Sequence, residues 1–406
     1  MKISQKFCFS LRGDAMGIYI NGNAPQTCYY GDKEVKKIYL GDALLWPTKK
    51  ELEYIGTITP LSVARKELAA ASVGDYALFG GGYSTMSAVD AYDAALTRTT
   101  PEPLSEQRYA LATATIGGYA LFGGGRFSGS GLVNVVDAYG TDLTRTTPQE
   151  NLRYARHSLA AAATRTHALF GGGTNSNGYG NAIYNAVEAY DENLTSQAVD
   201  GLTYPGRYNL AAAATEHYVM FGGGLAGAKT TTSAVGGPEE TTRVDAYDTS
   251  LTHTTPTELS FVRERLAAAS VGDYILFAGG KTGYSAGAAY PMYSNIVDAY
   301  DANLTRTTPT ELSVARYEIA AVAINGYAVF GGGKRDMSIN FSAAVDVYDA
   351  NLTRTTPTEL SKETTLLAAA AVGNYALFGG GSYMRPTGPT SAMGTDTDTV
   401  HAYKLK

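Results

Sequence analysis

Residues 61–82 read Leu-Ser-Val-Ala-Arg-Lys-Glu-Leu-Ala-Ala-Ala-Ser-Val-Gly-Asp-Tyr-Ala-Leu-Phe-Gly-Gly-Gly, and residues 89–101 read Val-Asp-Ala-Tyr-Asp-Ala-Ala-Leu-Thr-Arg-Thr-Thr-Pro. Near-copies of this text occur seven times along the 406 residues. Their glycine triplets are spaced 43 to 56 residues apart and begin at Gly80, Gly123, Gly171, Gly222, Gly331 and Gly379, with Ala278 in the first place of the remaining copy. Repeats of this length are typical of four-stranded propeller blades. The sequence therefore predicts an all-β, seven-bladed propeller.

One unit, residues 259–309, shows how a copy becomes a blade with strands A to D. Its alanine-rich run is too short for a helix and is closed at once by a Gly-Asp turn signal. Small side chains also suit an innermost strand, where blades converge. The expected strands, in order A to D, are Leu266–Ser270, Tyr274–Gly279, Val297–Tyr300 and Thr305–Thr308, with Pro309 ending the last.

The seventh blade lacks its own outer strand, because the chain stops soon after Val400–Tyr403, its strand C. The stretch Gly56–Ser62 matches the ending of the outer strands in other copies. We therefore expect about Leu52–Thr59 to pair with the C-terminal strand and to close the ring, which removes open sheet edges.

Composition and charge limit the function classes. The net charge is −6 and the pI is near 5.5, which argues against a nucleic-acid partner. No apolar run approaches a membrane span or a signal-peptide core, so synthesis in the bacterial cytoplasm without a signal peptide is expected. Cys8 and Cys28 precede the repeats. Reduced thiols are favoured over a bridge between them.

The repeated arginine, the glycines after an apolar strand and the later Val-x-x-Tyr-Asp resemble the kelch repeat over residues 52–406. The resemblance implies a kelch-type propeller. It departs from the family pattern where a tryptophan is expected after strand C, because this chain has Thr99, Thr146, Gln197, Thr254, Thr307 and Thr355 there.

Residues 1–50 are predicted to form a separate β-hairpin module before the propeller of residues 51–406. The segment Ile38–Trp46 resembles N-terminal segments of tail-associated proteins in prophages of gut Firmicutes. That resemblance implies attachment of the chain to other tail proteins, a place in the virion after assembly, and, by analogy with tail-tip binders, a homotrimer.

Variation between copies is confined to the B–C loops, which should share one face of the propeller with the D–A connections. We call this the loop face and the opposite one the turn face. The loops are rich in tyrosine and small polar residues, as binding loops are. Binding is favoured over merely solvated loops, and the candidate ligand-binding tyrosines of these loops are Tyr179, Tyr184, Tyr284, Tyr290, Tyr293 and Tyr383.

A repeated arginine precedes strand A in six blades, at Arg65, Arg108, Arg156, Arg207, Arg263 and Arg316, and Thr364 replaces it in the seventh. A ring of guanidinium groups at the channel mouth could bind an acidic glycan. The alternative, which its regular recurrence favours, is that each arginine bonds glycine-turn carbonyls of the neighbouring blade. The residues that follow it vary and are better candidates for recognition: Tyr109, His157, Tyr208 and Tyr317, with Lys66 and Glu264.

Catalytic and metal sites are not expected from the sequence. The five histidines do not converge on one face position, so no metal or other cofactor is predicted. Glu67, Glu264 and Glu318 are interpreted as solvated rim carboxylates rather than as an acid–base pair. The sequence thus favours a non-catalytic phage tail-tip protein that recognises a bacterial surface glycan or receptor. The alternatives are a carbohydrate-active enzyme of the sialic acid isomerase or glycosidase type, and an intracellular kelch scaffold.

Overall fold

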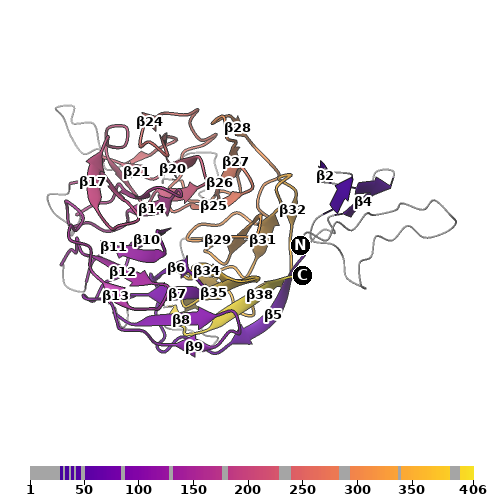
Figure 1. Cartoon of the computed structure of the whole chain (residues 1–406), viewed down its shortest axis with the longest axis horizontal. Helices are drawn as coiled ribbons and strands as arrows, with labels where there is room; N and C mark the ends of the chain where they lie inside the picture. Colours follow the sequence, from indigo (N-terminus) through magenta and orange to yellow (C-terminus); the bar gives the residue numbers. More distant parts are fainter. Residues whose placement is uncertain are drawn as a thin grey trace, which may run out of the picture. The chain divides into compact units, whose positions relative to one another are not determined.

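The structure is a computed structural model that describes residues 28–30, 33–35, 38–40, 43–46, 51–83, 87–127, 131–175, 182–227, 239–282, 293–336, 340–384 and 394–406. The chain divides into two units, residues 1–51 with 406, and residues 52–405. Every element in the described part is a β-strand (Figure 1). The predicted all-β fold is confirmed.

The first unit contains two short antiparallel hairpins. Strand β1 (Cys28–Tyr30) pairs with β2 (Lys33–Val35), and β3 (Ile38–Leu40) pairs with β4 (Ala43–Trp46). The second pair has a register shift between Ile38 and Tyr39. The expected hairpins are present.

The second unit is a ring of seven four-stranded antiparallel sheets, with strands A to D in chain order in the first six (Figure 1). Alternating small and apolar side chains form the inner strands, and the outer strands are short and polar. Blades 1 to 3 are β6 (Ala69–Val73), β7 (Tyr76–Gly80), β8 (Val89–Asp93), β9 (Arg98–Thr99); β10 (Ala112–Ile116), β11 (Tyr119–Gly123), β12 (Val136–Gly140), β13 (Arg145–Thr146); and β14 (Ala160–Ala163), β15 (Ala168–Gly171), β16 (Val187–Tyr190), β17 (Ser196–Val199).

In blade 5, five of the eight predicted strand ends differ by one residue from those observed. The strands of blades 4 to 6 repeat this order. They are β19 (Ala211–Ala214), β20 (Tyr218–Gly222), β23 (Val244–Asp248), β24 (His253–Thr254); β25 (Ala267–Val271), β26 (Tyr274–Ala278), β27 (Val297–Tyr300), β28 (Arg306–Thr307); and β29 (Ala320–Ile324), β30 (Tyr327–Gly331), β31 (Val345–Tyr348), β32 (Arg354–Thr355).

Blade 7 is completed by the start of the propeller. Its strands are β34 (Ala368–Val372), β35 (Tyr375–Gly379), β38 (Val400–Leu405) and β5 (Leu52–Ile58). The β38–β5 register runs from Val400 opposite Ile58 to Leu405 opposite Leu52, with a shift after Ala402. The predicted closure by the N-terminal strand is confirmed.

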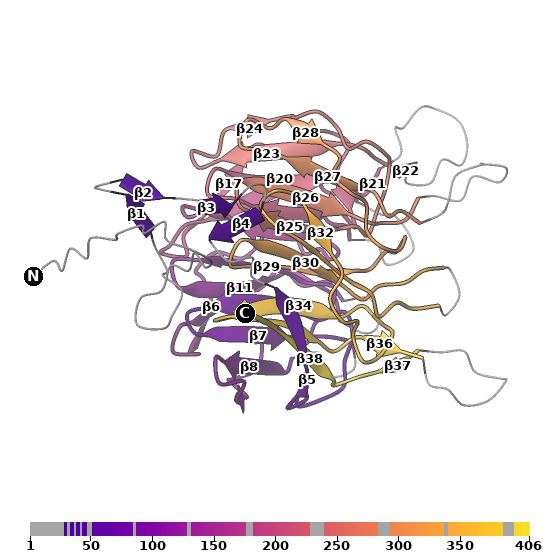
Figure 2. The ribbon, with the colours of Figure 1, turned by 90° about the vertical axis from the view of Figure 1, so that its right-hand side faces the viewer.

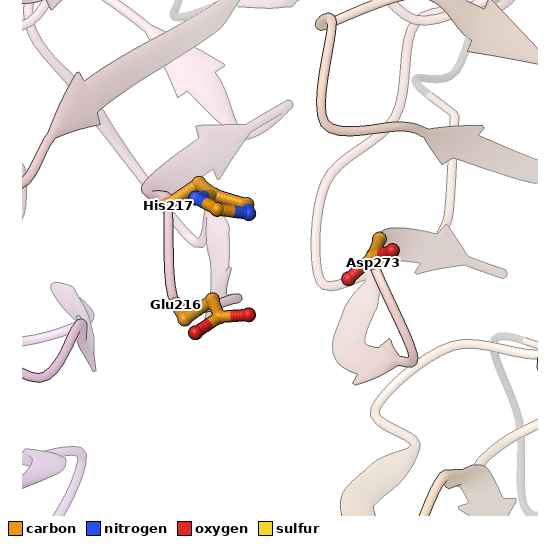
Figure 3. Close-up of side chains that lie close together, drawn as sticks. All are labelled: Glu216, His217 and Asp273. Carbon is orange, nitrogen blue, oxygen red and sulfur yellow. The ribbon is translucent and has the colours of Figure 1, made fainter. Parts of the chain in front are cut away.

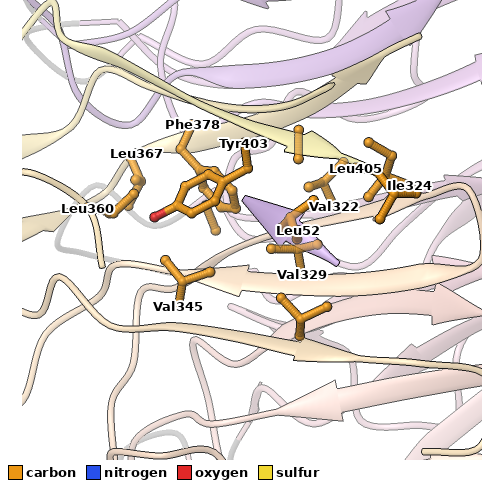
Figure 4. Packing of buried hydrophobic residues seen from close by; sticks show 13 residues of the cluster. Leu52, Val322, Ile324, Val329, Val345, Leu360, Leu367, Phe378, Tyr403 and Leu405 are labelled. Carbon is orange, nitrogen blue, oxygen red and sulfur yellow. The ribbon is translucent and has the colours of Figure 1, made fainter. Parts of the chain in front are cut away.

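Neighbouring blades are joined by a recurring set of contacts. The strand-B phenylalanine faces the first glycine of the preceding blade's triplet, since a Cβ on Gly80 would lie 2.7 Å from the Phe122 ring. The strand-C tyrosine donates its hydroxyl to the connection that enters its blade, as Tyr92 does to the Thr59 carbonyl at 2.9 Å. Figure 4 shows the packed residues between blades 6 and 7, where Tyr403 lies among aliphatic side chains. Six triplets thus begin with a glycine because a neighbouring ring occupies the side-chain space, and Ala278 takes this place in blade 5.

Two three-stranded sheets extend beyond the blades on one face (Figure 2). They are β18 (Arg207–Tyr208), β21 (Leu225–Ala226), β22 (Glu239–Glu240), and β33 (Thr364–Thr365), β36 (Ser382–Tyr383), β37 (Thr395–Asp396). Both join a D–A connection to a B–C loop. This is the loop face.

Candidate binding site at the channel mouth

Seven residues, one from each blade, encircle the channel on the loop face. They lie two positions after the repeated arginine or its replacement, and all have left-handed backbone with φ between 51° and 56°. Their main chains are linked around the axis by hydrogen bonds, such as Ala110 N–H to the Glu67 carbonyl at 3.1 Å and Ser158 N–H to the Ala110 carbonyl at 3.0 Å. We call this set the mouth ring: Glu67, Ala110, Ser158, Asn209, Arg265, Glu318 and Leu366.

The mouth ring surrounds a cavity of about 350 Å³, which we call the cup. All seven mouth-ring residues line it, together with the apolar residues that follow six of them. The latter are Leu68, Leu111, Leu159, Leu210, Ile319 and Leu367. The cup therefore combines an aliphatic lining with a few polar groups, as small-molecule sites usually do.

Charged groups are concentrated on one side of the cup. Arg265, whose side chain is 42% exposed, is ion-paired with Glu318. Glu318 also accepts a hydrogen bond from the Thr365 hydroxyl at 3.0 Å. Glu264, behind the ring, is paired with Lys281 at 2.9 Å and accepts from the Asn209 amide at 2.8 Å. Glu264 and Glu318 are largely buried, so the interpretation of both as solvated rim carboxylates is wrong.

Glu67 differs from these carboxylates. It is half-buried, and its burial, together with the nearby charge of Glu318, raises the pKa of its carboxyl group. The cationic groups of Lys66, Arg265 and Arg126 act in the opposite direction but are outweighed. The ionised form of Glu67 is therefore stabilised less than that of a solvated glutamate.

A second ring of residue pairs surrounds the mouth ring. In each blade the residue after the repeated arginine, or after Thr364, lies beside the residue after the glycine triplet, as Tyr109 does beside Arg126 and Tyr317 beside Lys334. Of the residues predicted for recognition, Tyr109, His157 and Tyr317 are mostly buried here and Tyr208 is half-buried. These four residues lie around the cup and do not line its interior.

Three of the predicted loop tyrosines contact neighbouring side chains. Tyr184 stacks on Tyr154 with ring centroids 4.8 Å apart, and Tyr293 stacks on Tyr317 at 5.5 Å. The Lys362 ammonium lies over the Tyr383 ring. The other predicted ones, Tyr179, Tyr284 and Tyr290, lie outside the described residues.

The six repeated arginines do not form a ligand-binding ring. Arg65, Arg108, Arg156, Arg207, Arg263 and Arg316 are each 0% exposed. Each donates to the strand-B phenylalanine carbonyl and to the strand-C carboxylate of its own blade, as Arg108 does to Phe122 at 3.1 Å and to Asp137 at 2.6 Å. The neighbouring blade is reached instead by the arginine main chain, since Gly82 N–H donates to the Arg108 carbonyl at 3.0 Å. The prediction of these arginines as ligand-binding residues is wrong, because they are buried between strands.

Sequence reasoning missed the mouth ring as a set and Arg265 as its cation. A signal was present, because the residue two places after the arginine changes from copy to copy while the arginine recurs. The closed ring gives these residues their left-handed backbone and brings them together around one cup.

The turn face carries one group of possible metal ligands among the described residues. Ligand atoms of Glu216, His217 and Asp273 lie within 4.8 Å of one another, and all three side chains are exposed (Figure 3). Exposed carboxylates beside one histidine do not define a metal site by themselves. Within the described part of the chain there is also no helix of the length and hydropathy that spanning a bilayer needs.

Comparisons with known proteins reveal a structural neighbour. No family model and no curated protein matches the sequence. The solved structure of YjhT, a kelch-type propeller with sialic acid mutarotase activity, is similar with a TM-score of 0.57 and 15% identity, over 74% of this chain and 99% of that one. Because this neighbour is a carbohydrate enzyme, the expectation of a non-catalytic protein is contradicted and is withdrawn. The fold of the second unit is that of a seven-bladed kelch-type β-propeller.

Proposed function

We propose that the protein recognises a carbohydrate, which binds in the cup. The carrying observation is that one cavity of about 350 Å³ presents aliphatic side chains together with Ser158, Asn209, Arg265 and the carboxylates of Glu67 and Glu318. A sugar ring has the complementary surface, with C–H groups on its faces and hydroxyl groups at its edge. A few polar groups in a largely apolar cavity orient such a ligand.

The variation within the mouth ring supports a binding role. Left-handed backbone costs a non-glycine residue roughly 1–2 kcal/mol, yet none of the seven mouth-ring residues is glycine. The C–D turns also contain left-handed residues, but these are leucine in six blades, for example Leu96 and Leu143. Leucine there packs into the core, which explains its constancy. The mouth ring has no such common packing role, so its side chains are free to differ for a ligand.

The proposal is tested by filling the cup. Ala110→Leu places in blade 2 the side chain that Leu366 already has at the equivalent left-handed position in blade 7. We expect this variant to keep the thermal stability of the wild type and to lose glycan-array signals, with Asp75→Ala on the turn face as control. Undiminished binding by Ala110→Leu would show that the cup is not the site.

A second candidate is acid–base catalysis on the bound sugar. Its support is that two carboxyl groups lie on the same side of the cup. That of Glu67 has a raised pKa, and that of Glu318 is ion-paired with Arg265. Two carboxyl groups of this kind can donate and accept a proton at a sugar oxygen. The check is the rate of anomer interconversion of sugars that the array identifies, followed by NMR exchange with wild type and Glu67→Gln. Equal rates with and without protein would exclude it.

Attachment to a larger particle is proposed from the sequence resemblance of residues 1–50 alone. In this proposal the hairpin module joins the propeller to tail proteins of a virion, as a homotrimer, and the receptor is a bacterial surface glycan. Mass measurement in solution of the full chain tests the trimer. Mixing purified tail particles with the chain, with and without residues 1–50, tests the attachment.

A further inference from the structure

Glu67 is the starting point for identifying the ligand more closely. Its side chain lines the cup and is half-buried. In the part of the chain that the structure describes, the Glu67 carboxylate makes no hydrogen bond or ion pair. A half-buried carboxylate of this kind has lost solvation without forming an ion pair, since Lys66, Arg265 and Arg126 act on it from beyond ion-pair distance.

Most other charged groups around the cup have partners of their own, and Arg126, a cation that acts on Glu67 but has no ion pair among the described residues, lies over the Tyr109 ring. Arg265 is paired with Glu318, and Lys281 is paired with Glu264. Lys66, the residue next to Glu67, has its ammonium nitrogen 3.1 Å from an Asp396 carboxylate oxygen. Among the cup-lining residues, Glu67 and Glu318 supply two negative charges and Arg265 one positive charge. The cup thus has one carboxylate in excess.

We propose that the ligand carries a protonated amine, and that its ammonium group binds the Glu67 carboxylate in the cup. This inference rests on the proposed carbohydrate function, and under it the ligand class is an amino sugar with a free amino group. The ammonium group supplies the missing counter-charge, while the aliphatic residues contact the C–H face of the ring.

The chemistry of the site favours ammonium over other cations. A hard metal ion needs several oxygen ligands at once, whereas Glu318 is committed to Arg265 and Thr365. An ammonium group needs only a few acceptors and can be desolvated together with the ring that carries it. The charge-assisted hydrogen bond it forms in a partly dry cavity is stronger than a neutral one.

The test compares three small sugars on the full chain. Glucosamine, N-acetylglucosamine and glucose share a ring, but only glucosamine carries an ammonium group. We expect glucosamine to bind at least tenfold more tightly than the other two by NMR titration at pH 7. Glu67→Gln should remove this preference, whereas Glu106→Gln, an exposed carboxylate on the same face, should retain it.

Proton linkage gives a second readout. Because burial and Glu318 raise the carboxyl pKa of Glu67, and Lys66, Arg265 and Arg126 oppose this, ammonium binding should release protons from the protein at pH values near that pKa. Calorimetry in buffers of different ionisation enthalpy measures the release. It should be absent in Glu67→Gln.

The outcomes separate the two proposals. Equal binding of all three sugars, or an undiminished glucosamine preference in Glu67→Gln, would overturn the amine assignment and leave carbohydrate recognition standing. Failure of the folded wild type to bind any of the three, together with an empty glycan array, would overturn both.

Discussion

At the scale of residues, a buried carboxylate that contacts two basic side chains recurs in five blades. Asp298 is 0% exposed, pairs with Arg263 on one side, and accepts from Arg306 at 3.1 Å on the other. Four other blades have the same arrangement around Asp90, Asp137, Asp245 and Asp346, with His253 as the outer group in blade 4.

Blade 7 replaces all three members of this device together. Thr364 takes the place of the inner arginine, His401 that of the carboxylate, and Tyr54 that of the outer basic residue. The Tyr54 hydroxyl lies 3.2 Å from His401 Nδ1. Removing one partner alone would leave a buried unpaired charge, which costs more than exchanging all partners for neutral groups. The sequence showed Thr364 as an exception, but its compensation depends on pairing across 347 residues.

Removing the carboxylate alone should therefore be severe. We expect Asp298→Ala to lower the free energy of unfolding by about 3–5 kcal/mol, because Arg263 stays buried without its counter-charge. Urea denaturation monitored by far-UV circular dichroism measures the loss of unfolding free energy. Asp301→Ala, which removes only an exposed turn carboxylate, is the control and should cost about 1 kcal/mol. Similar losses for both variants would contradict the buried-pair account.

His401 predicts a pH dependence of stability. Burial, aided by the charge of Lys362, lowers its pKa from 6.5 to about 4 in the folded protein. Between these values the unfolded chain binds a proton that the folded one does not, so acid favours unfolding. The contribution of His401 to the free energy of unfolding is complete above pH 6.5 and falls by roughly 3 kcal/mol toward pH 4.

The measurement is the unfolding free energy of wild type and His401→Gln between pH 7 and pH 4.5. The wild type should lose more stability over this interval than the variant does. Parallel curves would show that His401 titrates normally in the folded state.

At the scale of elements, the first and last strands of the propeller unit, β5 and β38, pair in one sheet. Val400, Ala402 and Tyr403 of β38 are 0% exposed, and β38 lies between β35 and β5. The strand therefore supplies core side chains to blade 7 and hydrogen bonds to both neighbours. Its loss would expose two sheet edges at once.

Deletion of residues 400–406 should accordingly abolish cooperative thermal unfolding or lower Tm by more than 10 °C. Each kcal/mol of lost stability lowers Tm by a few degrees, and this deletion removes several kcal/mol. Deletion of residues 1–49 is the matched control, because it removes more chain but leaves β5 intact. We expect the control to keep the wild-type Tm. Calorimetry distinguishes the two, and a larger effect of the N-terminal deletion would contradict the closure argument.

At the scale of the whole molecule, a repeated scaffold carries a mouth ring whose side chains vary, with glutamate alone occurring twice. Equivalent hydrogen bonds link the mouth-ring backbones, while their side chains range from alanine to arginine. The repetition supplies rigidity and the variation supplies chemistry. A ligand at the axis therefore meets side chains of six different types on one rigid frame.

Sequence alone predicts the seven blades, the order of their strands and the closure by β5, because these follow from local periodicity, turn residues and the count of copies. It also located the repeated arginines and the glutamates of the mouth. The roles of these arginines and glutamates follow from contacts that exist only in the folded ring. Each arginine meets a carboxylate about 25 to 38 residues away and is buried by it, whereas Glu67, Arg265 and Glu318 come from different blades and meet at the axis. Such neighbours are set by ring closure, which no single repeat encodes.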